Sequence, residues 1–294
     1  MQISANRIAL EVEDHGSPAG EPLVLIMGLG MQLVAWHEDF VQSLVSRGFR
    51  VIRFDNRDIG LSQSFDHLGV PNLGLETVRH ALRLPVHSPY SLADMADDTA
   101  GILDVMGIPK AHICGASMGG MVAQQVAFRH PQRVKSLTLM MTTSGRRSLP
   151  GPSLKVRSAM LSRPVDPNSI DSVIDHYVRL YKLIGSPGFP SSDEWLTKRL
   201  GMSVRRSYRP RGTARQLTAI AADGDRSPML SRIKVPTQVL HGTADPLVPV
   251  AAAHDLAAKI PNARLDLVEG MGHDLPVPLW PRFATCIGAA ASRA

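Results

Sequence analysis

Three short segments of the chain carry residue types that together could perform nucleophilic catalysis. The first, Gly115-Ala116-Ser117-Met118-Gly119, fits the pattern Gly-x-Ser-x-Gly. It follows the apolar run His112-Ile113-Cys114 and precedes an apolar stretch with helical spacing, which predicts a sharp turn from a strand into a helix. Glycines beside such a turn leave room for a strained backbone, and the amides that open the helix point towards developing negative charge. We therefore predict that Ser117 is a catalytic nucleophile.

A serine hydroxyl becomes an effective nucleophile only when a neighbouring base accepts its proton. In enzymes with this turn, an acidic residue and then a histidine follow the serine along the chain. His273 stands in the glycine-rich segment Gly270-Met271-Gly272-His273-Asp274, directly after the last expected strand, and is the expected base. Asp245 follows the strand that ends at Leu240 and is the expected acid, which would orient the imidazole and stabilise its cation.

The same residues also have ordinary structural explanations. Asp245 could cap the helix that begins near Pro249, and His273 could be a surface residue of a flexible loop. Asp255 and Asp274 are rival acids, although Asp274 adjoins His273 in the chain and is therefore a poor geometric partner. The order serine, aspartate, histidine, with each residue after a strand, favours the catalytic interpretation.

Acyl transfer also needs hydrogen-bond donors for the oxyanion of the tetrahedral intermediate. One donor is expected to be the main-chain N–H of Met118, the residue after the nucleophile. The other is expected in the loop Met27-Gly28-Leu29-Gly30, where we assign the N–H of Leu29. Each such donor typically contributes about 3 kcal/mol in the transition state.

The elements that must position these segments alternate between short β-rich runs and longer stretches with helical period, which indicates parallel βαβ units. Near-continuous apolar strands also require a sheet that is covered on both faces. The expected buried strands are residues 23–26, 51–54, 112–114, 136–140, 238–240 and 265–268, with a leading antiparallel strand at 8–12. Helices are expected near residues 34–47, 91–106, 119–130, 250–259 and 278–290.

Between Thr143 and Pro228 this alternation stops. The segment is rich in Pro, Arg and Ser, with helical stretches near residues 169–183 and 193–202. We predict that residues 143–228 form a helical lid inserted after the sixth strand, and that residues 1–142 and 229–294 form the core. Ligands of open α/β sheets bind beyond the carboxyl ends of the strands, so a lid at this point would cover the reaction site.

Together with the stretch Asp55-Asn56-Arg57-Asp58-Ile59-Gly60-Leu61-Ser62, these segments resemble the α/β-hydrolase superfamily over nearly the whole chain. Residues 51–58 resemble the branch that contains aclacinomycin methylesterase and related carboxylesterases. The resemblance implies a mostly parallel eight-stranded sheet with helices on both faces, and a serine hydrolase that cleaves a carboxylic ester through an acyl-enzyme without a cofactor. Many relatives carry His-Gly where this chain has Met27-Gly28, which removes a loop-bracing side chain but leaves the amide donor. Asp55 and Arg57 are expected to brace the loop after the fourth strand.

Several apolar and aromatic residues could line a pocket for the acyl or alcohol part of a small, largely apolar ester. Each of them could equally belong to ordinary core or lid packing. The candidates are Met31, Trp36, Tyr177, Tyr181 and, less directly, Met118 and Phe189.

Other functions remain compatible with the same three residues. A lactonase, a carbon–carbon bond hydrolase and a cofactor-free perhydrolase could all use them, and a ligand-binding receptor could retain them on the same fold. An aspartate-nucleophile hydrolase is disfavoured because Ser117 occupies the turn. A peptidase that holds an N-terminal amine would require an acidic lid.

Composition and charge restrict the remaining possibilities. Residues 146–215 contain 14 Lys and Arg against five Asp and Glu, so this segment carries more than the chain's whole net charge of +6. A solvated helical surface explains that excess, although an anionic substrate would also fit. We find no nucleic-acid motif, metal cluster or dinucleotide fingerprint, no apolar run long enough for membrane insertion, and no signal peptide. With two cysteines, a cytoplasmic monomer or homodimer that acts on a small-molecule ester is expected.

Overall fold

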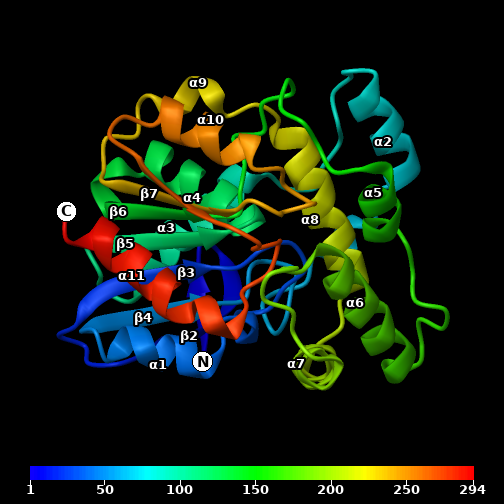
Figure 1. The fold of residues 1–294 in the computed structure, drawn as a ribbon, viewed down its shortest axis with the longest axis horizontal. Coiled ribbons are helices and arrows are strands. Elements are labelled where there is room, and N and C mark those ends of the chain that lie inside the picture. Colours follow the sequence, from blue (N-terminus) through cyan, green and yellow to red (C-terminus); the bar gives the residue numbers. More distant parts are fainter.

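The structure, a computed structural model that describes residues 1–294, is built on one eight-stranded sheet with the strand order β1-β2-β4-β3-β5-β6-β7-β8 (Figure 1). β1 and β2 pair antiparallel with their neighbours, and all later strands are parallel. The predicted mostly parallel sheet is therefore confirmed. The strands are β1 Gln2–Ala5, β2 Ile8–His15, β3 Glu21–Ile26, β4 Phe49–Phe54, β5 Ala111–Ala116, β6 Val134–Met140, β7 Thr237–Gly242 and β8 Arg264–Val268.

Helices cover both faces of the sheet, as the apolar strands require. On one face lie α3 (Leu92–Val105), α4 (Met118–Arg129) and α10 (Ala251–Lys259), which pack over a cluster of 33 buried residues. On the other lie α1 (Glu38–Val45) and α11 (Trp280–Ala291), over a cluster of 21. Short 3-10 turns occur at Leu33–Ala35, Asp66–Leu68, Pro131–Arg133 and Val277–Leu279.

The segment between β6 and β7, which we call the lid, is helical. Its members are α5 (Leu154–Met160), α6 (Ile170–Ile184), α7 (Asp193–Arg206) and α8 (Pro210–Asp223), followed by the short α9 (Ser227–Leu230). α6 and α7 enclose a small apolar cluster of their own, centred on Val173, Leu196 and Leu200. A further helix that was not predicted, α2 (Leu73–Ala81), follows β4 and packs on α8 at the right-hand end of Figure 1.

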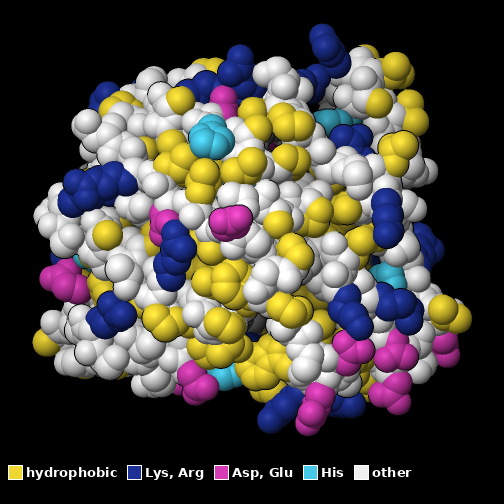
Figure 2. Space-filling model, in the orientation of Figure 1, with side chains coloured by type: hydrophobic (Ala, Val, Ile, Leu, Met, Phe, Trp, Pro, Cys, Tyr) yellow, Lys and Arg dark blue, Asp and Glu magenta, His cyan; other side chains and the backbone are white.

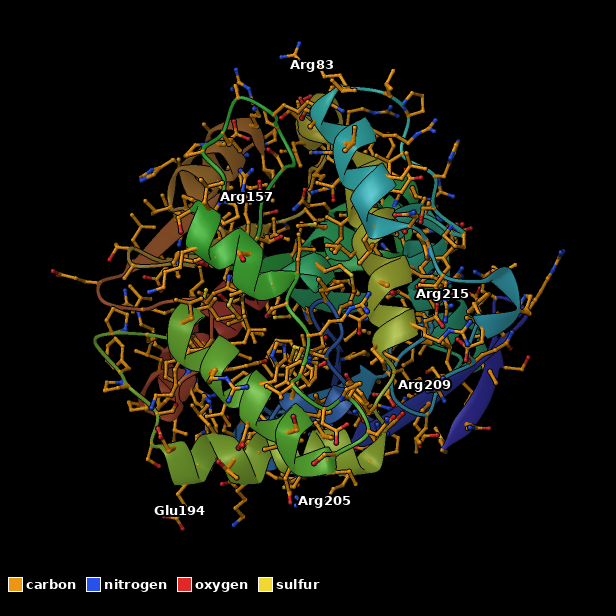
Figure 3. The ribbon with its side chains drawn as sticks, turned by 90° about the vertical axis from the view of Figure 1, so that its right-hand side faces the viewer. Arg83, Arg157, Glu194, Arg205, Arg209 and Arg215 are labelled. Carbon is orange, nitrogen blue, oxygen red and sulfur yellow. The ribbon has the colours of Figure 1, made fainter.

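Arginines of the lid attach it to the core. Arg215 of α8 forms a bidentate pair with Asp58 at 2.6 and 2.7 Å, and both side chains are almost fully buried. Arg206 of α7 donates to Asp55 at 2.7 Å. Figure 3 labels Arg215 on α8 and Arg209, which directly precedes that helix. Arg209 donates to the main-chain carbonyl of Ser62 at 2.7 Å. Part of the basic excess therefore holds the lid on the core.

The remaining basic side chains do not form a single basic surface on the face shown in Figure 2. There the Lys and Arg side chains are dispersed among hydrophobic and neutral atoms. This distribution matches the interpretation of the charge as a solvated helical surface. No helix in the structure combines the length and apolar character that crossing a bilayer would demand.

Candidate active site

Ser117 occupies the turn between β5 and α4, as predicted. Its backbone has φ 54° and ψ −120°, a conformation that a residue with a side chain rarely adopts, so the predicted strain is confirmed. A Cβ atom on Gly119 would lie 2.1 Å from the carbonyl oxygen of Ile26, and one on Gly115 would lie 2.2 Å from that of Gly119. Both glycines are therefore sterically required, and the tight packing holds the serine in place.

A continuous chain of hydrogen bonds links Ser117, His273 and Asp245. Nε2 of His273 lies 3.0 Å from Oγ of Ser117, and Nδ1 lies 2.7 Å from Oδ2 of Asp245. A carboxylate only accepts hydrogen bonds, so Nδ1 carries the proton and the lone pair of Nε2 faces the hydroxyl. His273 and Asp245 are 8% and 5% exposed, which keeps this chain largely away from water.

The loop after β7 fixes the orientation of Asp245. Its second oxygen, Oδ1, accepts from the main-chain N–H groups of Leu247 and Val248 at 2.9 and 2.8 Å. His241, at the end of β7, donates from Nε2 to the carbonyl of Val248 at 2.7 Å, and the same nitrogen lies 3.5 Å from Oδ2 of Asp245. Burial lowers the pKa of His241, so this ring is neutral.

The two rival acids, Asp255 and Asp274, form hydrogen bonds with other residues. Asp255 accepts from Ser144 at 2.6 Å and pairs with Arg146 at 3.3 Å. Asp274 accepts from the hydroxyl of Ser186 in the lid. Neither carboxylate is hydrogen-bonded to the ring of His273, so the geometry favours Asp245 as the partner.

The loop of residues 27–30 lies beside the nucleophile. A Cβ atom on Gly28 would be 3.1 Å from Cβ and 3.7 Å from Oγ of Ser117. Gly30 N–H is already occupied, since it donates to Oε1 of Gln216 at 2.9 Å. The N–H of Leu29, from this loop, and that of Met118, the first residue of α4, therefore remain the oxyanion donors that we propose.

Two side chains that the sequence did not reveal hold this loop. Asn56 donates to the carbonyl of Met27 at 3.0 Å, so it braces the loop at its first residue. Gln216 of α8 donates to the carbonyl of Arg57 at 3.0 Å while it accepts from Gly30. Asn56 stood within a recognised motif, whereas nothing near Gln216 in the sequence indicated a role.

The predicted bracing by Asp55 and Arg57 is confirmed. Asp55 accepts from the main-chain N–H groups of Leu33 at 2.7 Å and Leu61 at 2.9 Å, which fixes the loops after β3 and β4 together. Arg57 forms a bidentate pair with Asp98 of α3, both bonds being 2.7 Å long.

The candidate pocket residues separate into two groups. The hydroxyl of Tyr181, on α6, donates to the sulfur of Met31 at 3.1 Å, so these two lie together next to residues 27–30, the proposed oxyanion loop. Tyr177 lies one helical turn earlier on α6 and packs edge-on against Tyr208, and burial raises its pKa to about 12. Trp36 is fully buried in the core cluster beneath α1, where it stacks on Phe40.

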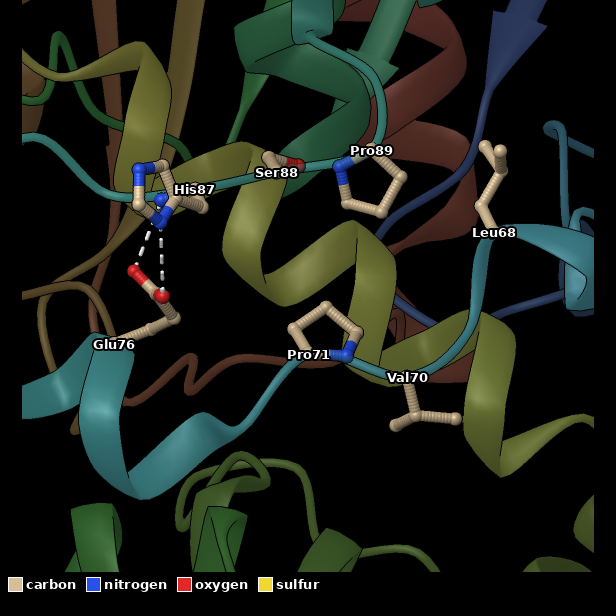
Figure 4. Close-up of a pocket in the computed structure, with 7 residues that line it drawn as sticks. All are labelled: Leu68, Val70, Pro71, Glu76, His87, Ser88 and Pro89. Atoms are coloured by element: carbon tan, nitrogen blue, oxygen red, sulfur yellow. Dashed lines mark hydrogen bonds and ion pairs between the residues drawn. The ribbon is translucent and has the colours of Figure 1, made fainter.

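A separate surface hollow of about 350 Å³ lies between α2 and the segments that flank it (Figure 4). Inside it, the carboxylate of Glu76 accepts from the main-chain N–H of His87 at 2.9 Å and lies 3.7 Å from the His87 ring. The seven residues that line the hollow include none of Ser117, Asp245 and His273. It is therefore not the site built around Ser117.

Comparisons with known proteins place this site in context. The family model described as the alpha/beta hydrolase fold matches residues 21–277. The chain is 27% identical to rhodomycin D methylesterase DauP of Streptomyces sp. strain C5. It is 28% identical to rhodomycin D methylesterase DnrP of Streptomyces peucetius. Each match covers 98% of this chain and 96% of the relative. A solved meta-cleavage product hydrolase from Pseudomonas fluorescens IP01 superposes with a TM-score of 0.76 and 22% identity, over 99% of this chain and 97% of that one. At that identity the likeness establishes the fold.

Proposed function

The chain belongs to the α/β-hydrolase fold family and is a hydrolase that acts on ester bonds, and we propose that it is a serine hydrolase whose catalytic residues are Ser117, His273 and Asp245. The observation that carries the proposal is the hydrogen-bonded chain from Ser117 Oγ through His273 to Asp245, located at a strained turn. Its substrate is a carboxylic ester of a small, largely apolar molecule.

In the acylation step, Nε2 of His273 accepts the hydroxyl proton while Oγ of Ser117 attacks the ester carbonyl carbon. The carbonyl oxygen becomes an oxyanion, which accepts hydrogen bonds from the N–H groups of Leu29 and Met118. Asp245 stabilises the imidazolium that forms. The imidazolium then donates its proton to the alcohol oxygen as the carbon–oxygen bond breaks, which leaves an acyl group on Ser117.

Deacylation repeats the same steps with water. Nε2 of His273, now neutral, accepts a proton from a water molecule, whose oxygen attacks the acyl carbon. The tetrahedral intermediate uses the same two amide donors, and the proton returns from the imidazolium to Oγ of Ser117. The products are the carboxylic acid and the free enzyme, so no other reactant is consumed.

The methylesterase relatives favour an ester of a small alcohol. Tyr181 and Met31, which meet beside the oxyanion loop, would contact the apolar part of such an ester. Lactones and carbon–carbon bonds could be cleaved by the same three residues, and a perhydrolase or a binding receptor could retain them. The similarity to two methylesterases is the observation that favours the ester.

A turnover measurement with p-nitrophenyl acetate and p-nitrophenyl butyrate tests the proposal. The wild-type protein is expected to release p-nitrophenol at a steady rate over many turnovers, and Ser117→Ala is expected to lose that rate while it keeps the melting transition. A single stoichiometric release, or an equal rate in the variant, would contradict the proposal. A panel of methyl esters, lactones and β-diketones then distinguishes the ester from the other bonds.

A further inference from the structure

The lid meets the loop of His273 through one short stretch at the end of α6. Residues 184–188, which we call the clamp segment, run alongside residues 270–274. The main-chain N–H of His273 donates to the carbonyl of Ile184 at 2.7 Å, and the N–H of Gly188 donates to the carbonyl of Gly270 at 2.9 Å. The loop that holds the proposed base is therefore hydrogen-bonded to the lid at both of its ends.

Ser186 stands at the centre of this contact and is 3% exposed. Its hydroxyl oxygen accepts from the main-chain N–H of Gly272 at 2.8 Å, and the hydroxyl donates to Oδ1 of Asp274. One side chain thus bonds the residue before His273 and the residue after it. Burial raises the pKa of Asp274, and the hydroxyl and main-chain N–H of Ser186 oppose that shift.

The packing at this contact leaves no space for side chains on its glycines. A Cβ atom on Gly272 would lie 2.3 Å from the carbonyl oxygen of Gly185, and one on Gly270 would lie 3.0 Å from Cα of Gly188. Gly270 also has φ +72°, which favours glycine at this position. The two segments therefore approach each other at backbone distance.

The same helix also reaches the other side of the site. Tyr181, one turn before the clamp segment, donates to Met31 beside the oxyanion loop, and its carbonyl accepts from Gly185 N–H at 2.7 Å. The last turn of α6 thus touches the loop of the base and the loop of the oxyanion donors. Catalytic groups must be held within a fraction of an ångström of their productive positions, so such a contact affects the rate directly.

We infer that Ser186 is a positioning residue for His273: through Gly272 and Asp274 it ties the base to the lid, so that His273 faces Ser117 only while the clamp segment is docked. This inference rests on the proposed function, because it assigns Ser186 a part in the same reaction. Ser186 itself touches neither the substrate nor the reacting atoms.

Steady-state kinetics of Ser186→Ala with p-nitrophenyl butyrate tests the inference. The change leaves a buried N–H and a carboxylate without their partner, and a displaced base is expected to lower kcat about 10- to 100-fold. KM is expected to change by less than about twofold, because the pocket is not altered. Ser158→Ala, an exposed serine of α5 without a side-chain hydrogen bond, is the matched control and should keep the wild-type kcat.

A second pair of variants addresses the carboxylate. Asp274→Ala should lower kcat as far as Ser186→Ala does, whereas Asp274→Asn keeps an oxygen acceptor and should recover most of that loss. The double variant Ser186→Ala/Asp274→Ala should have a kcat within about twofold of the kcat of the slower single variant, because the two residues act as one unit. The comparison of Asp274→Ala with Asp274→Asn remains decisive if Ser186→Ala does not fold.

Hydrogen–deuterium exchange separates the clamp from the catalytic proposal. Amides of residues 270–274 should exchange faster in Ser186→Ala than in the wild type. Faster exchange together with a wild-type kcat would overturn the positioning role. A fall in kcat/KM that comes from KM alone would overturn it too. If Ser117→Ala retains turnover, the proposed function fails instead, whatever Ser186→Ala does.

Discussion

Nδ1 of His273 lies 2.7 Å from Oδ2 of Asp245, although the two residues stand 28 positions apart in loops that follow different strands. β7 and β8 are parallel neighbours, so their carboxyl ends open at the same edge of the sheet and bring the two loops together. Ser117 follows β5 and reaches the same edge. The sheet topology is therefore what assembles the proposed catalytic residues.

Removal of the imidazole should abolish catalysis without loss of the fold. We expect His273→Ala to lower kcat for p-nitrophenyl butyrate by a factor on the order of 10⁴ to 10⁶, because the hydroxyl of Ser117 then has no base. His254→Ala is the matched control, since His254 is exposed on α10. Equal losses in the two variants, or none in either, would refute the role of His273.

Gly119, two residues after Ser117, should tolerate no side chain. In Gly119→Ala the new Cβ would meet the carbonyl of Ile26 at 2.1 Å, so the turn must shift. We expect loss of most activity and a lower melting temperature. Gly288→Ala in α11 is the control, because nothing lies within 4 Å of its Cβ position. That change should raise stability by about 0.5–1 kcal/mol. Thermal melts and initial rates measure both outcomes.

The buried ion pair between lid and core should be costly to break. Arg215→Met leaves the carboxylate of Asp58 buried without its cation, and about 3–5 kcal/mol of unfolding free energy should be lost. Arg205→Met removes a surface arginine that lies 3.8 Å from an exposed Asp171, and should cost less than about 0.5 kcal/mol. Urea denaturation of both variants provides the comparison. Similar midpoints would show that Arg215 does not anchor the lid.

Acid should destabilise the protein through His241. Burial lowers the pKa of this ring in the folded protein, so below its ordinary value of about 6.5 the unfolded chain binds more protons. Stability therefore rises with pH through that range and falls on acidification. A proton on Nδ1 would have no acceptor, because this buried atom has no hydrogen-bond partner.

The variant His241→Gln tests this prediction. The amide can still donate to Val248 but does not titrate. Between about pH 6 and pH 5, the wild type should lose more stability than the variant. Parallel pH profiles of unfolding free energy for the two proteins would contradict the assignment.

Much of the core could be predicted because its signals are local. The expected helix at residues 91–106 is α3, Leu92–Val105, and the expected strand at 136–140 lies within β6, Val134–Met140. Buried apolar runs and a serine between glycines are visible in a few consecutive residues. The turn at Ser117 could be predicted for the same reason.

Elements that bury few apolar side chains were missed. α8 is 14 residues long, and most of the side chains that it buries are polar, among them Arg215, Gln216 and Thr218. α5 buries only Val156, and β1 buries only Ala5. Periodicity identifies a helix or strand by its apolar face, and these elements have little or none.

Contacts between distant segments also could not be predicted from the sequence. Gly30 and Gln216 are 186 positions apart, and Ser186 and Asp274 are 88 apart. Each pair forms because the lid folds back over the carboxyl ends of the strands. A prediction from local spacing finds the chemically reactive residues and cannot find the side chains that hold their loops.

The most direct test of the central claim is to locate the nucleophile. The protein would be incubated with a fluorophosphonate, whose phosphorus is attacked by the nucleophile as fluoride leaves, which gives a tetrahedral adduct. The adduct would be mapped by mass spectrometry of proteolytic peptides. We predict one adduct per chain, on Ser117, which forms at a much lower rate in His273→Ala. An adduct on another residue, or active enzyme without any adduct on Ser117, would contradict the account.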